Sequence, residues 1–171
     1  IASKENKLSP HRFVRNDALL WIIRTQLEIG NEDDASGMIE TLYHDDLFPK
    51  RLTEKLAELK AYLFYRKQQA DSAAIYLEKS LGACEDNAEQ SRRLFLIAQL
   101  YAKSNQNKKA DDAFEKAVAL TTDPIMEAYA RIYQIGLTSN ETNQEQKIDQ
   151  NVKALINMAN KEKYATYRSI I

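Results

Sequence analysis

Apolar residues recur along the chain at the spacing of amphipathic helices, and the helices come in pairs. Within residues 94–120, Ala98 and Tyr101 share one helical face, and Ala110 and Phe114 share another. The polar letters SNQN between these two faces leave room only for a tight turn. The segment therefore predicts two antiparallel helices in contact.

The same pattern returns along the chain at intervals close to the 34-residue tetratricopeptide period. It predicts four repeats in one domain spanning 1–171, at residues 11–47, 50–84, 87–122 and 123–160, with 161–171 beginning a further one. The order of small and aromatic positions resembles the tetratricopeptide family. That resemblance implies an all-α, right-handed superhelix of about four helix pairs with partial terminal helices. Three positions depart from the pattern. Ile23 stands where a small residue is usual, Gln26 where an aromatic residue is usual, and Lys60 where an apolar residue is usual.

Small residues are expected where two helices of a pair approach most closely. We predict that Ala98 meets Ala110, and that Tyr101 and Phe114 fill the wider gaps and reach the neighbouring pairs. A single pair cannot bury its apolar face alone, so stacking on neighbours is required.

Local signals agree with these helices. Asp123 before Pro124 predicts a capped helix start, and Asn87 with Gln90 resembles a capping box. Gly82 predicts a helix end just before it.

The composition argues against broad nucleic-acid binding and against a membrane span. The 171 residues carry 24 basic and 25 acidic side chains, for a formal net charge of -1, which argues against broad nucleic-acid binding. No run approaches the roughly 18 apolar residues that a membrane span needs. The chain starts without Met and stops within an apolar pattern, so we expect a piece of a longer protein.

Few side chains have the character of catalytic or metal-binding residues. His11 and His44 offer no convergent metal set, and Cys84 has no basic neighbour in the sequence to activate it. We predict no catalytic residue, no metal and no cofactor, and therefore no enzyme. The single tryptophan, Trp21, is expected to pack on the face of the first repeat.

The family resemblance implies that the first helix of each pair lines a concave surface. Matching its positions one by one gives eight candidates for a protein-binding groove, rich in the aromatic and arginine side chains that anchor partners: Arg24, Tyr62, Tyr65, Arg66, Arg92, Phe95, Gln99 and Arg131. The alternative is that the tyrosines are ordinary packing residues. A chaperone-docking clamp is disfavoured, because Arg24, Tyr62, Gln99 and Arg131 occupy positions where that clamp uses Asn.

Three longer segments resemble a narrower group. They are AELKAYLFYRKQQADSAAIYLEKSL, MEAYARIYQIGL and KALINMANKEKYATYRSII. Together they look like the tetratricopeptide lipoproteins of Bacteroidetes associated with gliding motility and type IX secretion (the PorW/SprE type). The resemblance implies a non-catalytic scaffold in the periplasm, anchored to the outer membrane through an upstream lipidated cysteine, with secretion-machinery proteins as partners. The alternatives are a chaperone-docking adapter and a regulatory segment of a larger enzyme or sensor, and a cytoplasmic location stays open.

The last residues yield a separate expectation. Tyr164, Tyr167, Ile170 and Ile171 should lack a partner helix, because the repeat that they begin is incomplete.

Overall fold

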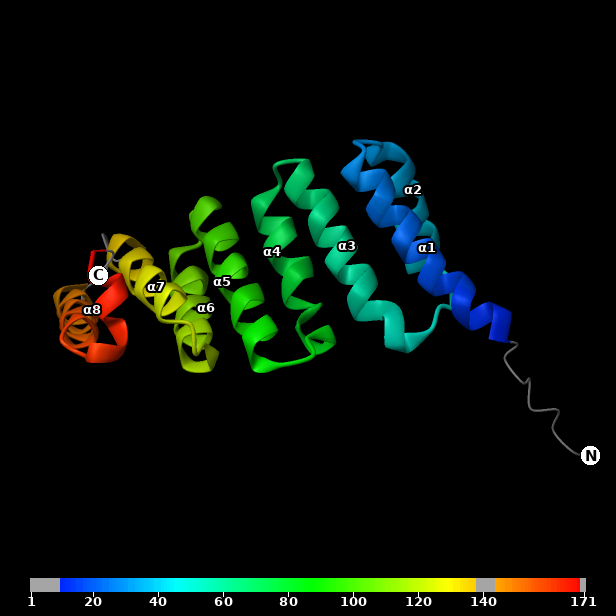
Figure 1. Cartoon of the computed structure of the whole chain (residues 1–171). Coiled ribbons are helices and arrows are strands. Elements are labelled where there is room, and N and C mark those ends of the chain that lie inside the picture. Colours follow the sequence, from blue (N-terminus) through cyan, green and yellow to red (C-terminus); the bar gives the residue numbers. More distant parts are fainter. Residues whose placement is uncertain (1–9, 138–143, 170–171) are drawn as a thin grey trace, which may run out of the picture.

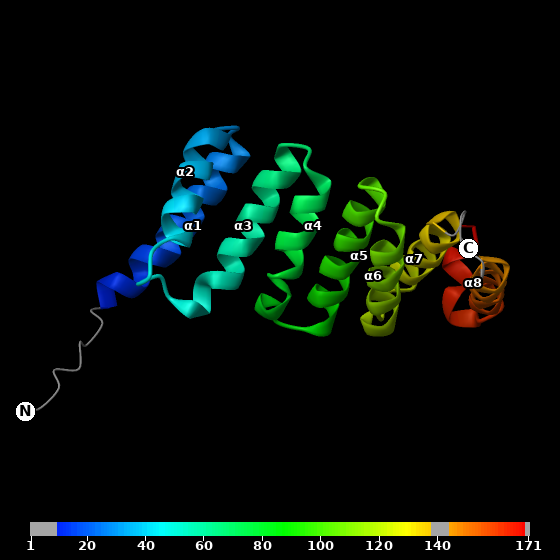
Figure 2. The same ribbon diagram turned by 180° about the vertical axis from the view of Figure 1, so that it is seen from behind.

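The computed structural model describes residues 10–137 and 144–169, and the regular elements of this part are all helical. The α-helices are α1 (Pro10–Glu28), α2 (Glu32–Tyr43), α3 (Thr53–Arg66), α4 (Ala70–Glu78), α5 (Asn87–Lys103), α6 (Asn107–Leu120), α7 (Pro124–Leu137) and α8 (Gln144–Ala159). Three 3-10 turns accompany them: η1 (Lys50–Leu52), η2 (Leu81–Ala83) and η3 (Glu162–Tyr167). Each α-helix packs on the next, and Figures 1 and 2 show an elongated row from α1 to α8.

The first three helix pairs turn in the same way. Gly30, Gln68 and Asn105 each follow a first helix and have positive φ angles of 89°, 59° and 58°. In each turn the next residue donates its amide hydrogen to the carbonyl five residues back, at 2.8 to 2.9 Å. This is the Schellman arrangement, in which a left-handed residue ends the helix. The repetition in the sequence is therefore matched by a repeated backbone geometry.

Small residues lie at the centre of the largest core. Ala98 on α5 and Ala110 on α6 are fully buried in one cluster, which α4 and α7 also enter. Tyr101 reaches back to α4, where its hydroxyl donates to Glu78 at 2.8 Å. Phe114 reaches forward and stacks on Tyr133 of α7, with ring centroids 5.4 Å apart. The expectation that the two aromatic residues link neighbouring pairs is confirmed.

The apolar core is divided along the row. One cluster joins α1, α2 and α3, the largest joins α3 to α7, and a third joins α7, α8 and η3. Each part of the chain is thus stabilised by its neighbours in the sequence, as in a repeat architecture.

Lys60 departs from the apolar pattern, and its surroundings explain why it is tolerated. The side chain is buried between α2 and α4, where its Nζ lies 2.7 Å from Glu40 and 4.5 and 4.9 Å from the ring centroids of Tyr43 and Tyr76. Burial alone would lower the pKa of Lys60, but Glu40 and Tyr76 together raise it above the ordinary value. A paired, ring-covered ammonium replaces the usual apolar contact.

The helix-boundary predictions have mixed outcomes. The cap at α7 is confirmed, since the Asp123 carboxylate accepts from the amide of Ile125 at 2.9 Å. The cap of α5 is Asp86, which accepts from the amide of Glu89, so the predicted box is wrong by one residue. Gly82 lies in η2, after α4 has already ended at Glu78. The Glu54 carboxylate lies beside Gly82, where a β-carbon would displace this exposed side chain.

Two predictions at the ends of the row are wrong. Tyr164 is buried against Ala128, Leu155 and Met158, because η3 folds back onto α7 and α8. Tyr167 is half-buried, and the predictions for Ile170 and Ile171 fall outside the described residues. Trp21 is 68% exposed instead of packed, because it lies outside the buried face of α1 that Leu20, Ile23 and Leu27 form.

Enlarging Ala98, where α5 and α6 approach closely, should destabilise the fold. We expect Ala98→Leu to lower the free energy of unfolding by about 1–3 kcal/mol, because the extra atoms have no space between α5 and α6. The matched control is Ala119→Leu at an exposed position of α6, where the change should stay within about 0.5 kcal/mol. Urea unfolding measures both, and equal effects would contradict close packing at Ala98.

Stability should fall in alkaline solution. Burial, and then the hydrogen bond to Glu78, raise the pKa of Tyr101, and the pKa of Lys60 is raised as well. Both groups keep their protons in the folded state after the unfolded chain has lost them, so the free energy of unfolding should decrease above about pH 10. Urea unfolding from pH 8 to 11 measures the slope, which should be shallower in Tyr101→Phe. A stability that is constant over this range would contradict the assignment.

Candidate protein-binding groove

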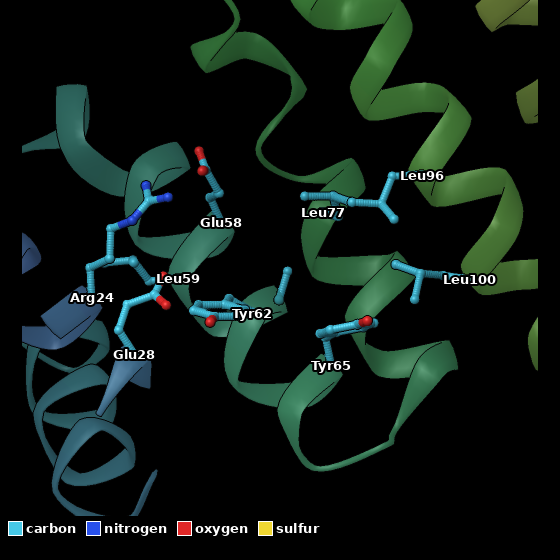
Figure 3. A pocket seen from close by; sticks show the side chains of 10 residues that line it. Arg24, Glu28, Glu58, Leu59, Tyr62, Tyr65, Leu77, Leu96 and Leu100 are labelled. Carbon is cyan, nitrogen blue, oxygen red and sulfur yellow. The ribbon is translucent and has the colours of Figure 1, made fainter. Parts of the chain in front are cut away.

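A cleft opens on the side formed by the first helices of the pairs. α3 packs on α4, and α4 packs on α5, whereas α3 and α5 are not a closely packed pair. The space between them is a cleft of about 450 Å³, and Leu77 of α4 lies at its floor. Figure 3 shows side chains from α1, α3 and α5 around it. We call it the upper cleft.

The upper cleft has an apolar part and a charged part. Tyr65, Leu96 and Leu100 approach it from α3 and α5, and Tyr65 and Leu96 keep 49% and 43% of their surface exposed. Arg24 and Glu28 lie on the α1 side. Exposed apolar side chains beside charged ones are typical of surfaces that bind a protein segment.

A second cleft of about 460 Å³ continues from the first and shares Arg24, Glu58 and Leu59 with it. We call it the lower cleft. Its remaining lining residues come from α1, α3, η2 and α5 and include Trp21, Lys55, Glu85, Glu89 and Arg93. The two clefts form one groove across α1, α3 and α5, which we call the concave groove.

Arg93 holds the two sides of the lower cleft together. Its guanidinium lies 3.1 Å from the Glu58 carboxylate on α3 and 2.9 Å from the Glu89 carboxylate on α5. It also donates to the Ser80 carbonyl at 2.8 Å and to the Ser80 hydroxyl at 3.0 Å. The side chain is only 10% exposed. A polar network therefore joins α3 and α5 at a place where the apolar core does not.

Three of the eight candidates line the groove together, namely Arg24, Tyr62 and Tyr65. Arg66 lies on α3 but pairs with Glu32 at 3.1 Å. Arg92 is exposed and Gln99 is half-buried on α5, and neither lines the two clefts.

The last two candidates face other neighbours. Phe95 packs on Phe114 and Tyr133, with ring centroids 5.3 and 6.0 Å away. Arg131 pairs with Glu127 at 3.0 Å and reaches Asn151 of α8, on the side of α7 that α6 and α8 share. The structure thus separates the eight candidates into three groove residues and five residues elsewhere.

Sequence reasoning missed the leucines of the cleft. The repeat pattern placed Leu77 on a packing face, and Leu96 and Leu100 were not among the groove candidates. The register matched Phe95 to the groove, but Phe95 packs on Phe114 and Tyr133, and the next residue, Leu96, lines the upper cleft. The available signal was that Leu96 is apolar but lies outside the helical face formed by Leu94, Ile97 and Ala98.

The residues with reactive side chains lie apart from the groove's upper cleft. In the parts of the chain that the structure describes, no three His, Cys, Asp or Glu side chains are placed to hold a metal ion. His44 caps the end of α2 and is exposed. The expectation that Cys84 has no basic neighbour is wrong, since Arg93 lies close enough to act on it, but burial outweighs this effect and raises the pKa of the thiol.

Comparison of the chain with protein-family models, curated proteins and solved structures finds no match. Each helix of the described residues is too short or too polar to cross a bilayer.

The Arg93 network should contribute measurably to stability. Arg93→Met should lower the free energy of unfolding by roughly 2–3 kcal/mol, because Glu58, Glu89 and the Ser80 carbonyl lose a shared donor. The neighbouring Arg92→Met is the matched control, since Arg92 is exposed, and should change it by less than about 0.5 kcal/mol. Thermal and urea unfolding compare the two variants. Similar losses of unfolding free energy in both would show that the Arg93 network does not hold α3 and α5 together.

Proposed function

We propose that the chain is a non-catalytic scaffold of the tetratricopeptide type that binds a segment of another protein in the concave groove. The observation that carries the proposal is the upper cleft, where exposed Tyr65 of α3 and Leu96 of α5 line an apolar part and Arg24 and Glu28 of α1 line a charged part. A right-handed superhelix is the arrangement that fits the repeated hairpins, the repeated Schellman turns and the neighbour-only packing.

The lining chemistry suggests how a segment would bind. Leucine and tyrosine side chains offer a desolvated site for one or two apolar anchors of the partner. No ion pair joins Arg24 or Glu28 to another of the described residues, so both are available to orient a polar or charged neighbour of the anchor. Such sites favour binding with little backbone movement, because the groove is already open.

The cellular setting follows from the resemblance to the gliding-motility and type IX secretion lipoproteins. We propose that the chain acts in the periplasm as part of an outer-membrane lipoprotein that bridges secretion components. The acidic side chains of the groove argue against the chaperone-docking alternative. Glu28 and Glu58 would repel the carboxylates of an acidic peptide.

Partner capture with matched variants tests this function. Leu96→Glu places a charge in the apolar part of the upper cleft and should abolish capture of proteins that the intact protein retains from cells of its own organism. Ile75→Glu is the control, because Ile75 is a comparably exposed apolar residue on α4 that does not line the groove.

Mass spectrometry identifies the captured proteins, and thermal melting confirms that both variants are folded. Secretion components among the proteins lost only with Leu96→Glu would support the cellular setting. Retention of every captured protein by Leu96→Glu would refute the groove as the binding site.

A further inference from the structure

α1 carries a second apolar face, opposite the one that packs on α2 and α3. Leu20, Ile23 and Leu27 are buried in the first core cluster. On the other side, Val14, Trp21, Ile22 and Ile29 keep 69%, 68%, 45% and 63% of their surface exposed. Two small residues complete this exposed face, which we call the α1 stripe: Val14, Ala18, Trp21, Ile22, Thr25 and Ile29. A helix that is apolar on both sides normally has neighbours on both sides.

The corresponding positions of later repeats are helix-packing positions. On α3 and the turn before it, Leu52, Leu56 and Leu63 match Val14, Ala18 and Thr25, and all three are buried in the cluster formed with α1 and α2. Lys60 matches Ile22 and reaches Glu40 of α2. In α1 these positions lie at the end of the row (Figure 1), so no helix among the described residues covers them. The α1 stripe therefore has the character of a packing face without its neighbour.

The α1 stripe has the same pattern in both chain directions. From either end it runs from one large residue through one small residue to the central pair Trp21 and Ile22. If a second α1 lies antiparallel, Ala18 of one copy meets Thr25 of the other, and small residues stand at both points of closest approach. Val14 and Ile29 of opposite copies then lie side by side at each end. A surface that is complementary to itself favours a two-fold dimer.

The polar group within the stripe is compatible with burial. The Thr25 hydroxyl donates to the Trp21 carbonyl at 2.9 Å, so its hydrogen bond is made within the helix. Burying this residue would leave no unpaired donor. The remaining members of the stripe have apolar side chains, apart from the indole nitrogen of Trp21 at the edge toward the lower cleft.

We propose that two copies of this chain associate through the α1 stripe, with their α1 helices antiparallel about a two-fold axis. The interface covers Trp21, the only tryptophan of the chain, which also lines the edge of the lower cleft, and it does not include Tyr65 or Leu96 of the upper cleft. It does not depend on the function proposed for the groove.

Sedimentation velocity on the purified chain, from about 1 to 200 µM, tests the association. The expected result is a monomer–dimer equilibrium. The fluorescence emission of Trp21 should shift to shorter wavelength as the fraction of dimer increases. Ala18→Gln should weaken association at least about tenfold, because a longer side chain blocks the close approach. Ile156→Gln, at an exposed apolar position of α8, should leave it unchanged. A monomer at all concentrations, or a dimer that Ala18→Gln does not weaken, would overturn the proposal.

Cross-linking tests the orientation in a Cys84→Ser background. An equimolar mixture of Val14→Cys and Ile29→Cys chains should form a disulfide between unlike chains on mild oxidation. Each variant alone should form little. Efficient cross-linking of Val14→Cys with itself would show parallel helices and contradict the antiparallel arrangement.

Discussion

The structure depends on the fact that no helix pair of this chain can bury its apolar residues alone. Alanines at the centre of a pair let α5 and α6 approach closely, and the large aromatic residues beside them extend into the adjacent pairs. Because each helix contacts the next helix or the next but one, the molecule grows as a row and keeps one long side open. The groove is a consequence of this mode of packing, since a compact core would have closed it.

The helix pairs are not joined by the same kind of contact along the row, although the sequence repeat suggests that they are. At the joint of α2, α3 and α4 the apolar contact is replaced by Lys60 with Glu40 and two tyrosine rings. On the groove side, α3 and α5 are joined through the charged network of Arg93. Hydrogen bonds and ion pairs between helices require specific distances and angles, whereas apolar contacts allow the helices to shift relative to each other. The Arg93 network therefore joins α3 and α5 beside the lower cleft, and Lys60 joins α3 to α2 and α4.

Sequence patterns were sufficient for features that depend on one pair or on adjacent pairs. The helix pairing, the buried alanines and the roles of Tyr101 and Phe114 follow from helical spacing and residue size. Features that depend on whether a neighbour is present could not be inferred in this way. Trp21 and Tyr164 both have the apolar character of packed residues, yet Trp21 is exposed, whereas Tyr164 of η3 is buried against α7 and α8. The groove was predicted in part, because adjacent residues of α5 have different neighbours: Phe95 packs on Phe114 and Tyr133, whereas Leu96 lines the upper cleft.

Small-angle X-ray scattering tests most directly whether the chain is a row of stacked pairs. A compact domain of 171 residues would have a radius of gyration of about 15–16 Å. With data extrapolated to zero concentration, we expect a clearly larger radius and a distance distribution with a long tail. A radius near the compact value with a symmetric distribution would contradict neighbour-only stacking, and with it the open groove.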